Sequence, residues 1–211
     1  MQSNNHRFRL YIKSNAFYWS NNKVLYSIMI ACLIIYFFKA EILKIENKNF
    51  DNVLMGILIA TLWIGIGLKF IGFTKTEPLN GKFEGFLFID KNSININNRG
   101  FQFEEVKNIE ISNDDYYGKL VGISKGNFNC ALSNGVNNYI KIKLYSGEII
   151  INYFELYYAN DFQKLRNELI NFYLNGKIEF ENLASVLGEK SKKEINELKL
   201  EIEKMSVNDN I

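Results

Sequence analysis

Two long apolar runs dominate the pattern of hydrophobic and polar positions along the chain. Val24–Phe38 contains no charged residue, and neither does Val53–Leu68, after which Lys69 and then Phe70–Phe73 complete the second run. About 20 helical residues are needed to cross a hydrocarbon core about 30 Å thick. The runs therefore predict a two-helix transmembrane hairpin over residues 23–75. A pair of buried core helices is the alternative, but the rest of the chain is too small and polar to surround both runs.

The basic residues around these runs predict the orientation of the hairpin, because they favour the cytoplasmic side of a membrane. Three lysines lie in the connection between the runs: Lys39, Lys44 and Lys48. They are outnumbered by the basic residues on the other side: Arg7, Arg9, Lys13, Lys23, Lys69, Lys75 and Lys82. We expect an integral protein of a bacterial inner membrane with both termini in the cytoplasm and the hairpin tip outside.

Residues 1–22 are interpreted as an N-terminal tail. A basic start before an apolar run is also typical of a signal peptide. The first run leads into Phe37-Phe38-Lys39-Ala40-Glu41, which lacks a small-x-small cleavage site, and a second apolar run follows. We therefore expect the first run to be retained.

Alternation of apolar and polar residues, typical of β-strands, begins after a linker that contains Pro78. Strands are predicted over Phe83–Asp90, Ser93–Asn97, Phe101–Ser112, Tyr139–Tyr145 and Glu148–Phe154. The alternation changes phase at Glu104-Glu105, which predicts a bulge or a bend in the third strand. Ser146-Gly147 predicts the turn of a hairpin between the last two strands.

Helical spacing replaces this alternation from Asp161 onward. A first helix is predicted from there to Asn175-Gly176, since glycine commonly follows a helix C-terminus, and a shorter one over Ile178–Leu187. Ser191-Lys192-Lys193-Glu194 has the capping-box pattern that opens a third helix. Its apolar residues recur at a/d spacing over only two heptads: Ile195, Leu198, Ile202 and Met205. Two alternatives remain for this helix, namely folding back on its own domain and self-association.

The order of these elements resembles a pleckstrin-homology-like (PH-like) barrel, in which a C-terminal helix plugs one end of a strongly bent sheet. The resemblance rests on this order and on three segments: Gly85–Ile89, Val106–Ile111 and Tyr139–Phe154. With the hairpin, the chain is similar to the bacterial membrane-bound PH-domain proteins. The resemblance implies a membrane α-helical hairpin plus an α+β soluble domain, with an antiparallel β-barrel or sandwich at residues 79–176 and a C-terminal helical extension at 177–211.

That family also implies a non-catalytic module for binding or scaffolding at the membrane. Its lipid-binding variants hold phosphoinositides with a basic cluster around the first hairpin of the barrel. Here the matching positions offer only Lys82, Lys91 and Arg99, which are widely spaced. A phosphate clamp requires several converging cations, so specific phosphoinositide binding is not expected.

The composition excludes several kinds of chemistry. The net charge of +2 gives no indication of a nucleic-acid partner. His6 is the only histidine, so neither a Cys–His or Ser–His nucleophile nor a histidine-rich zinc site is expected. Cys32, in the first run, and Cys130, in a loop, are poor disulfide candidates, and Asn113-Asp114-Asp115 lacks the spacing of a calcium loop.

We therefore expect no cofactor, no metal and no enzymatic activity. Two alternatives stay open. An enzyme with a pair of Asp or Glu side chains is one, because their pairing in space is invisible in a sequence. An accessory subunit of a membrane transporter is the other.

The long, glycine-rich stretch Asn113–Asn138 is the predicted binding region, because apolar and aromatic residues on a loop are suited to recognising partners. The expected partners are the lipid bilayer and a protein of unknown identity. The candidate partner-binding residues are Tyr116, Tyr117, Phe128 and Leu132. In the alternative interpretation Leu120–Ile123 is one more strand, and Phe128 and Leu132 pack against the core.

Overall fold

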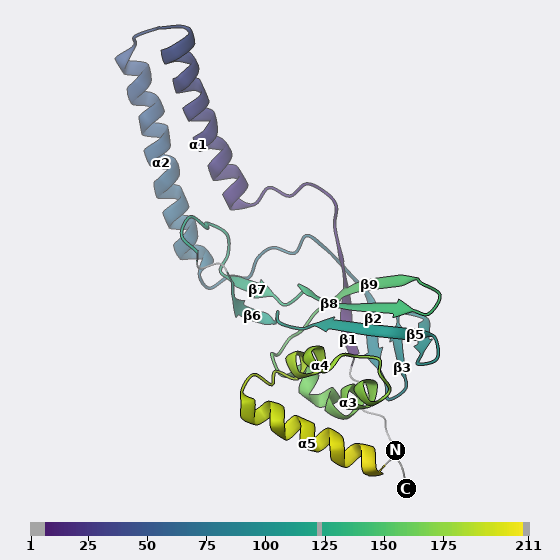
Figure 1. The fold of residues 1–211 in the computed structure, drawn as a ribbon. Coiled ribbons are helices and arrows are strands. Elements are labelled where there is room, and N and C mark those ends of the chain that lie inside the picture. The colour runs from purple at the N-terminus through teal and green to yellow at the C-terminus, as the bar shows by residue number, and fades with distance from the viewer. Residues whose placement is uncertain (1–6, 122–123, 209–211) are drawn as a thin grey trace. The chain divides into compact units, whose positions relative to one another are not determined.

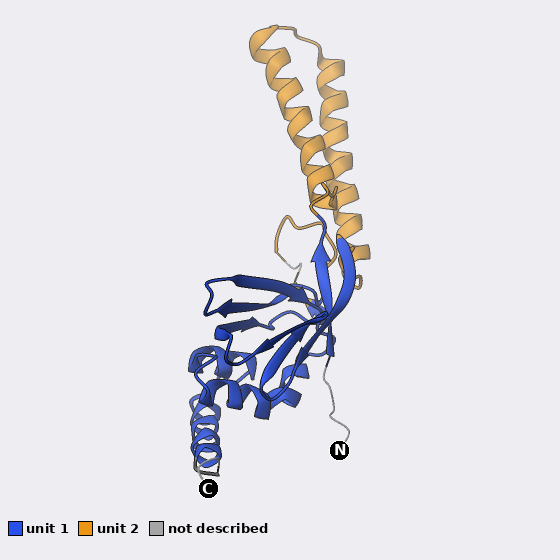
Figure 2. Cartoon of the chain, turned by 90° about the vertical axis from the view of Figure 1, so that its right-hand side faces the viewer, with its two compact units in different colours: residues 1–14, 81–119, 134–211 blue, residues 15–80, 120–133 orange. Residues whose placement is uncertain are grey.

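The structure, a computed structural model, describes residues 7–121 and 124–208 (Figure 1). His6 and the Gly122-Ile123 pair of the predicted strand Leu120–Ile123 lie outside these residues. The chain divides into two compact units, shown in blue and orange in Figure 2. The sheet unit contains Met1–Ser14, Gly81–Lys119 and Asn134–Ile211, and the hairpin unit contains Asn15–Asn80 and Leu120–Ser133.

The strands are β1 (Arg7–Lys13), β2 (Gly81–Ile89), β3 (Ser93–Ile96), β4 (Arg99–Gln102), β5 (Val106–Ser112), β6 (Tyr117–Leu120), β7 (Leu132–Asn134), β8 (Asn138–Leu144) and β9 (Ile149–Phe154). The helices are α1 (Asn21–Phe37), the π-helical turn η1 (Phe38–Ile42), α2 (Lys48–Gly72), the 3-10 helix η2 (Asp161–Leu165), α3 (Arg166–Leu174), α4 (Phe180–Val186) and α5 (Lys192–Asn208). Strands occupy all five predicted regions, although the third region, Phe101–Ser112, is divided between β4 and β5, and the helices predicted after Asp161 are confirmed.

A seven-stranded antiparallel sheet in the order β4-β3-β2-β1-β9-β8-β5 forms the sheet unit, which confirms the expected α+β class. Its main difference from the sequence interpretation is β1, because residues 1–22 were expected to be a tail. Arg7–Lys13 instead pairs with β2 on one side and β9 on the other, with Lys13 opposite Gly81. Phe8 and Leu10 face the core, and Arg7 and Arg9 are exposed. The hairpin unit is therefore inserted between two paired strands.

The two edge strands of this sheet, β4 and β5, are consecutive in sequence. A short turn at residues 103–105 joins them, closed by hydrogen bonds from Glu105 N to Gln102 O (3.0 Å) and from Val106 N to Phe103 O (3.2 Å). The predicted break at Glu104-Glu105 is therefore a turn between two strands. Because this turn connects opposite edges, the sheet must be strongly bent.

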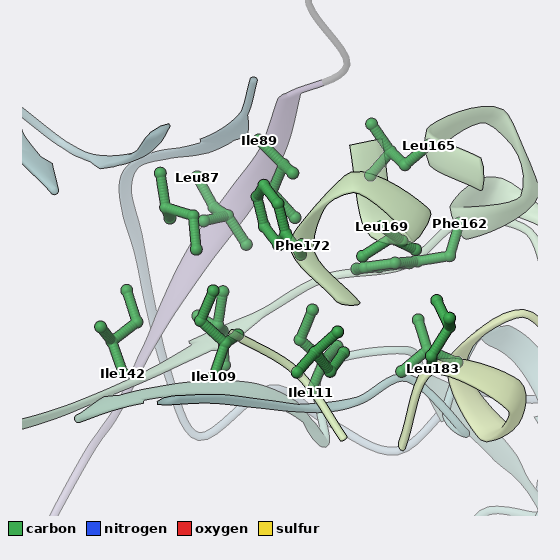
Figure 3. Packing of buried hydrophobic residues seen from close by; sticks show 14 of the residues in the cluster. Leu87, Ile89, Ile109, Ile111, Ile142, Phe162, Leu165, Leu169, Phe172 and Leu183 are labelled. Carbon is green, nitrogen blue, oxygen red and sulfur yellow. The ribbon is translucent and has the colours of Figure 1, made fainter. Parts of the chain in front are cut away.

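One hydrophobic core joins the sheet to the C-terminal helices, with Leu87 and Ile109 of the sheet facing Leu169 and Phe172 of α3 (Figure 3). The segment expected as a separate extension, residues 177–211, shares this core through Ile178, Leu183, Ala184, Val186, Leu187, Leu198 and Ile202.

The last helix, α5, has the folded-back arrangement. Leu198 is fully buried, and Arg166 of α3 forms ion pairs with Glu201 of α5 (2.8 Å) and with Glu189 (2.6 Å). The capping box is confirmed, since Glu194 N donates to Ser191 Oγ (3.2 Å) and Ser191 N donates to Glu194 Oε2 (2.8 Å). Three of the four apolar a/d residues of α5, Leu198, Ile202 and Met205, thus pack against the core of their own chain.

The hairpin unit contains two helices that are long and apolar enough to cross a membrane, Asn21–Ile42 and Lys48–Gly72. Only 17% of the apolar window of each is buried. At the connection between them, the buried Lys39 pairs with the Asp51 carboxylate and donates to Asn47 O (3.2 Å). The ion pair and the hydrogen bond provide partners for the Lys39 ammonium group, which would otherwise be buried without one.

Candidate functional site

The four predicted partner-binding residues belong to different units. Tyr116 and Tyr117 lie in the sheet unit, whereas Phe128 and Leu132 lie in the hairpin unit. Tyr116 is half-buried and packs against the core. Tyr117 is exposed and stacks on Tyr157, with ring centroids 5.1 Å apart. Partner binding by these four residues stays a prediction.

Phe128 packs against both helices of the hairpin. Its ring centroid lies 6.0 Å from that of Tyr26 in α1. On α2 it faces Gly65, where a Cβ atom would lie 2.9 Å from Phe128 Cε1 and 3.2 Å from Leu25 Cδ1. The missing side chain at residue 65 therefore makes the space that the ring occupies.

Hydrogen bonds fasten the rest of this loop, residues 124–132, to the helices, and we call it the docked loop. Asn22 is central, because its Oδ1 accepts from Phe128 N (2.7 Å) and its Nδ2 donates to Asn127 Oδ1 (2.9 Å). Tyr26 OH donates to Gly126 O (2.7 Å), and Lys69 Nζ donates to Ser124 O (3.2 Å). The docked loop is thus a part of the hairpin unit, held by side chains from both helices.

The docked loop continues into β7, where Leu132 is half-buried. Leu132 N donates to Lys75 O (3.2 Å), and Leu132 O accepts from Glu77 N (2.9 Å). Of the expected additional strand Leu120–Ile123, only Leu120 belongs to a described strand, β6, which pairs with β7 in a separate two-stranded sheet. Phe128 and Leu132 pack within the hairpin unit, which sequence reasoning did not foresee.

Asn138 fixes the start of β8, the strand that follows β7 in the chain. It is fully buried, and its Nδ2 donates to Asp115 O (2.7 Å) and Gly135 O (2.8 Å), while its Oδ1 accepts from Asp115 N (2.9 Å). Gly135 has φ +71°, and a Cβ there would lie 2.2 Å from Leu156 O, so a larger residue would not fit. These contacts make both ends of the stretch Asn113–Asn138 structural.

A second candidate surface lies on the sheet unit, on the side of β1, β9 and β8 that faces away from the core. We call it the β9 face, and its residues are Arg7, Arg9, Tyr139, Lys141, Lys143, Ile149, Ile151 and Tyr153. The register places Ile149 opposite Lys143, Ile151 opposite Lys141, and Tyr153 opposite Tyr139. Sequence reasoning missed this surface because the consecutive residues Ile149–Ile151 do not reveal which of them points outward.

Ion pairs and hydrogen bonds order the charged residues of the β9 face. Arg9 forms a bidentate pair with Glu155 (2.7 and 2.8 Å). Glu110 accepts from Tyr139 OH (2.6 Å) and from Lys141 Nζ (3.0 Å). These two hydrogen bonds, from Tyr139 and then from Lys141, hold the pKa of the Glu110 carboxyl below its usual value, and the bond to Glu110 raises the pKa of Tyr139.

The side chains with catalytic or metal-binding potential are dispersed. Within residues 7–121 and 124–208, no group of three or more His, Cys, Asp or Glu side chains could hold a metal ion. Cys32 is buried in α1, and Cys130 is a free, half-buried thiol in the docked loop. The expectations of no enzyme, no cofactor and no metal remain predictions.

Comparison with known proteins finds no matching protein family, no matching curated protein and no matching solved structure.

Proposed function

We propose that the chain is a membrane-anchored, non-catalytic binding or scaffolding protein, with α1 and α2 spanning a bacterial inner membrane and a PH-like domain in the cytoplasm. The observation that carries the proposal is the place of the apolar helices in the chain. They are inserted between β1 and β2, which pair from Arg7 opposite Phe88 to Lys13 opposite Gly81, with one register shift between Arg9 and Tyr11. The chain must therefore leave and return on one side of a membrane, which two crossings allow and one crossing does not.

The low burial of the two helices supports the same proposal. Large apolar side chains are exposed along both of them, for example Leu33 (57% exposed) on α1 and Ile64 (57% exposed) on α2. Exposed apolar surface of this extent is unfavourable in water and favourable in a hydrocarbon core. Cleavage after α1, as for a signal peptide, would also remove β1 from the centre of the sheet.

Two features of the sheet unit support a PH-like barrel. The sheet must bend so that β4 and β5 meet at the turn of residues 103–105. The fully buried Leu165 and Leu169 belong to η2 and α3, the consecutive helices that follow the last strand. The membrane hairpin does not precede the barrel, as the resemblance implied, but is inserted after its first strand. The basic residues that flank the hairpin support the cytoplasmic placement of this domain.

The test of the anchor must keep β1, because deletion of residues 1–75 would remove a central strand along with the hairpin. Lys13 and Gly81 are directly paired, so an Asn-Gly turn can replace residues 14–80 and join β1 to β2 as an ordinary β-hairpin. We expect this variant to be soluble and folded, while the full chain stays in the membrane fraction after an alkaline wash.

Ile59→Arg, in the middle of α2, serves as a milder variant. It should make insertion less favourable by about 3 kcal/mol on a translocon scale. If the Asn-Gly variant still sediments with membranes after the alkaline wash, the hairpin is not the anchor and the proposed function fails.

A further inference from the structure

The apolar character of the β9 face is unusual for its position. A solvated face of an antiparallel sheet normally carries polar residues. Here β9 is flanked by β1 and β8 in the middle of the sheet, yet Ile149 is 53% exposed, Ile151 52% and Tyr153 45%. The helices of the sheet unit pack on the opposite, core side (Figure 1).

The charged side chains that β1, β8 and β9 contribute to this face are all basic. The strands β1, β8 and β9 contain no acidic residue, whereas β1 contributes Arg7 and Arg9 to the face and β8 contributes Lys141 and Lys143. Arg9 and Lys141 are paired with carboxylates that lie outside these strands. Among the described residues, no ion pair involves Arg7 or Lys143. The β9 face is therefore apolar along β9 and positively charged on both sides of it.

We infer that the β9 face docks on the surface of a bilayer that contains anionic lipids. Isoleucine and tyrosine side chains enter the boundary between head groups and acyl chains favourably, and flanking lysine and arginine bind anionic head groups. This inference rests on the proposed membrane anchor. Residues 14–20 and 73–80 are short links to the spanning helices, so the bilayer is present at a high effective concentration and weak docking suffices.

Two other occupants fit the surface less well. Proteins that bind single-stranded nucleic acid stack bases on aromatic rings, whereas the most exposed positions on β9 are Ile149 and Ile151. A second copy would bring two positively charged faces together, and like charges across an interface are unfavourable. Both occupants are outcomes of the experiment below.

The experiment uses the full chain in nanodiscs, with Cys32→Ala and Cys130→Ser as background. An environment-sensitive fluorophore is attached at one of three positions: Ile151→Cys on the β9 face, Leu200→Cys on α5 as a control of similar exposure (56%), or Ile59→Cys in α2. Nitroxide-labelled lipids provide the quencher. The discs contain either zwitterionic lipid alone or a mixture with phosphatidylglycerol.

We expect lipid quenching at residue 151 in discs with phosphatidylglycerol, weaker quenching in zwitterionic discs, and none at residue 200. Arg7→Gln and Lys143→Gln should each lower the ratio of docked to free protein about fivefold, because each lysine or arginine near an anionic surface contributes a comparable factor. Lys193→Gln, at an exposed position of α5, should leave the ratio unchanged.

Quenching at residue 59 without quenching at residue 151 would overturn the docking inference and leave the anchor intact. No quenching at residue 59 would instead overturn the proposed anchor. A label at residue 151 that responds to an added RNA oligonucleotide and not to lipid would identify a nucleic-acid surface. Excimer formation between pyrene labels at residue 151 of two copies would identify a dimer interface, and either result would also overturn the inference.

Discussion

Replacing Gly65 by alanine tests whether the docked loop is held by the ring of Phe128. The new methyl group would lie 2.9 Å from Phe128 Cε1 and 3.2 Å from Leu25 Cδ1. Gly67, two residues further along the same helix, provides a matched control, because a Cβ at that position meets nothing within 4 Å. Both changes remove a glycine from the interior of α2.

The size of the effect follows from the comparison of these two variants. Alanine favours a helix over glycine by about 1 kcal/mol at either position, so this contribution cancels. The remaining difference is the cost of overpacking, about 1–3 kcal/mol. This overpacking cost cannot exceed the free energy of the contacts that the Phe128 ring makes, because the ring can instead rotate out of the space beside residue 65.

Limited trypsin digestion measures this difference. The exposed Lys125 lies in the docked loop, next to Gly126 and Asn127, which are bound to the helices. Cleavage after Lys125 then follows the population of the released loop, so 1–3 kcal/mol corresponds to a rate increase of about 5- to 150-fold. We expect this increase for Gly65→Ala in nanodiscs and no increase for Gly67→Ala.

A double-mutant cycle identifies the partner of residue 65. In a Phe128→Ala background the ring is absent, so Gly65→Ala should add nothing to the cleavage rate. Equal rates for Gly65→Ala and Gly67→Ala in the unmodified background would refute the docking contact.

Two further predictions concern the sheet unit. Leu169→Ala should lower the free energy of unfolding by about 2–5 kcal/mol, because Leu169 is fully buried between helix and sheet; an unchanged urea midpoint in detergent would contradict its place in the core. Hydrogen bonds from Ser191 N and Lys190 N, then from the Ser191 hydroxyl, lower the pKa of Glu194. Its contribution to stability is therefore present above the unfolded-state pKa of about 4.3 and is lost as the pH falls through the lower folded-state value. Glu194→Gln should remove this part of the acid dependence of helicity, measured by circular dichroism, and an identical acid titration would count against the capping box.

Local patterns predicted most of the sheet unit, because the strands β2, β3, β4, β5, β8 and β9 and each helix after Asp161 have their own periodicity, whereas β6 and β7 do not. β1 was missed although Phe8 and Leu10 alternate with Arg7 and Arg9 in its sequence. Its partner β2 begins at Gly81, on the far side of the whole hairpin. Without that distant partner, the short basic segment before α1 has the same local pattern as the basic flank of a membrane helix.

The docked loop shows a second limit of sequence reasoning. The contacts of Phe128 depend on Gly65 and Asn22, and those of Leu132 on Lys75 and Glu77, all of which lie far away in the sequence. A glycine in an apolar helix is common, and nothing in the local pattern marks it as the space for an aromatic ring. The β9 face depends in the same way on register, which decides that Ile149 and Ile151 point outward.

The central claim is that α1 and α2 span the membrane with the sheet unit in the cytoplasm. It is tested most directly by the accessibility of the hairpin tip and of the sheet unit to an external reagent in intact cells. The variants are Glu46→Cys and Lys143→Cys. Glu46 lies in the exposed connection between the two helices, and Lys143 is an exposed residue of β8. With the native cysteines replaced, we expect an impermeant thiol reagent to label residue 46 in intact cells and residue 143 only after lysis. Labelling of residue 143 in intact cells while residue 46 is protected would reverse the orientation, and labelling of both before lysis would contradict a hairpin that spans the membrane.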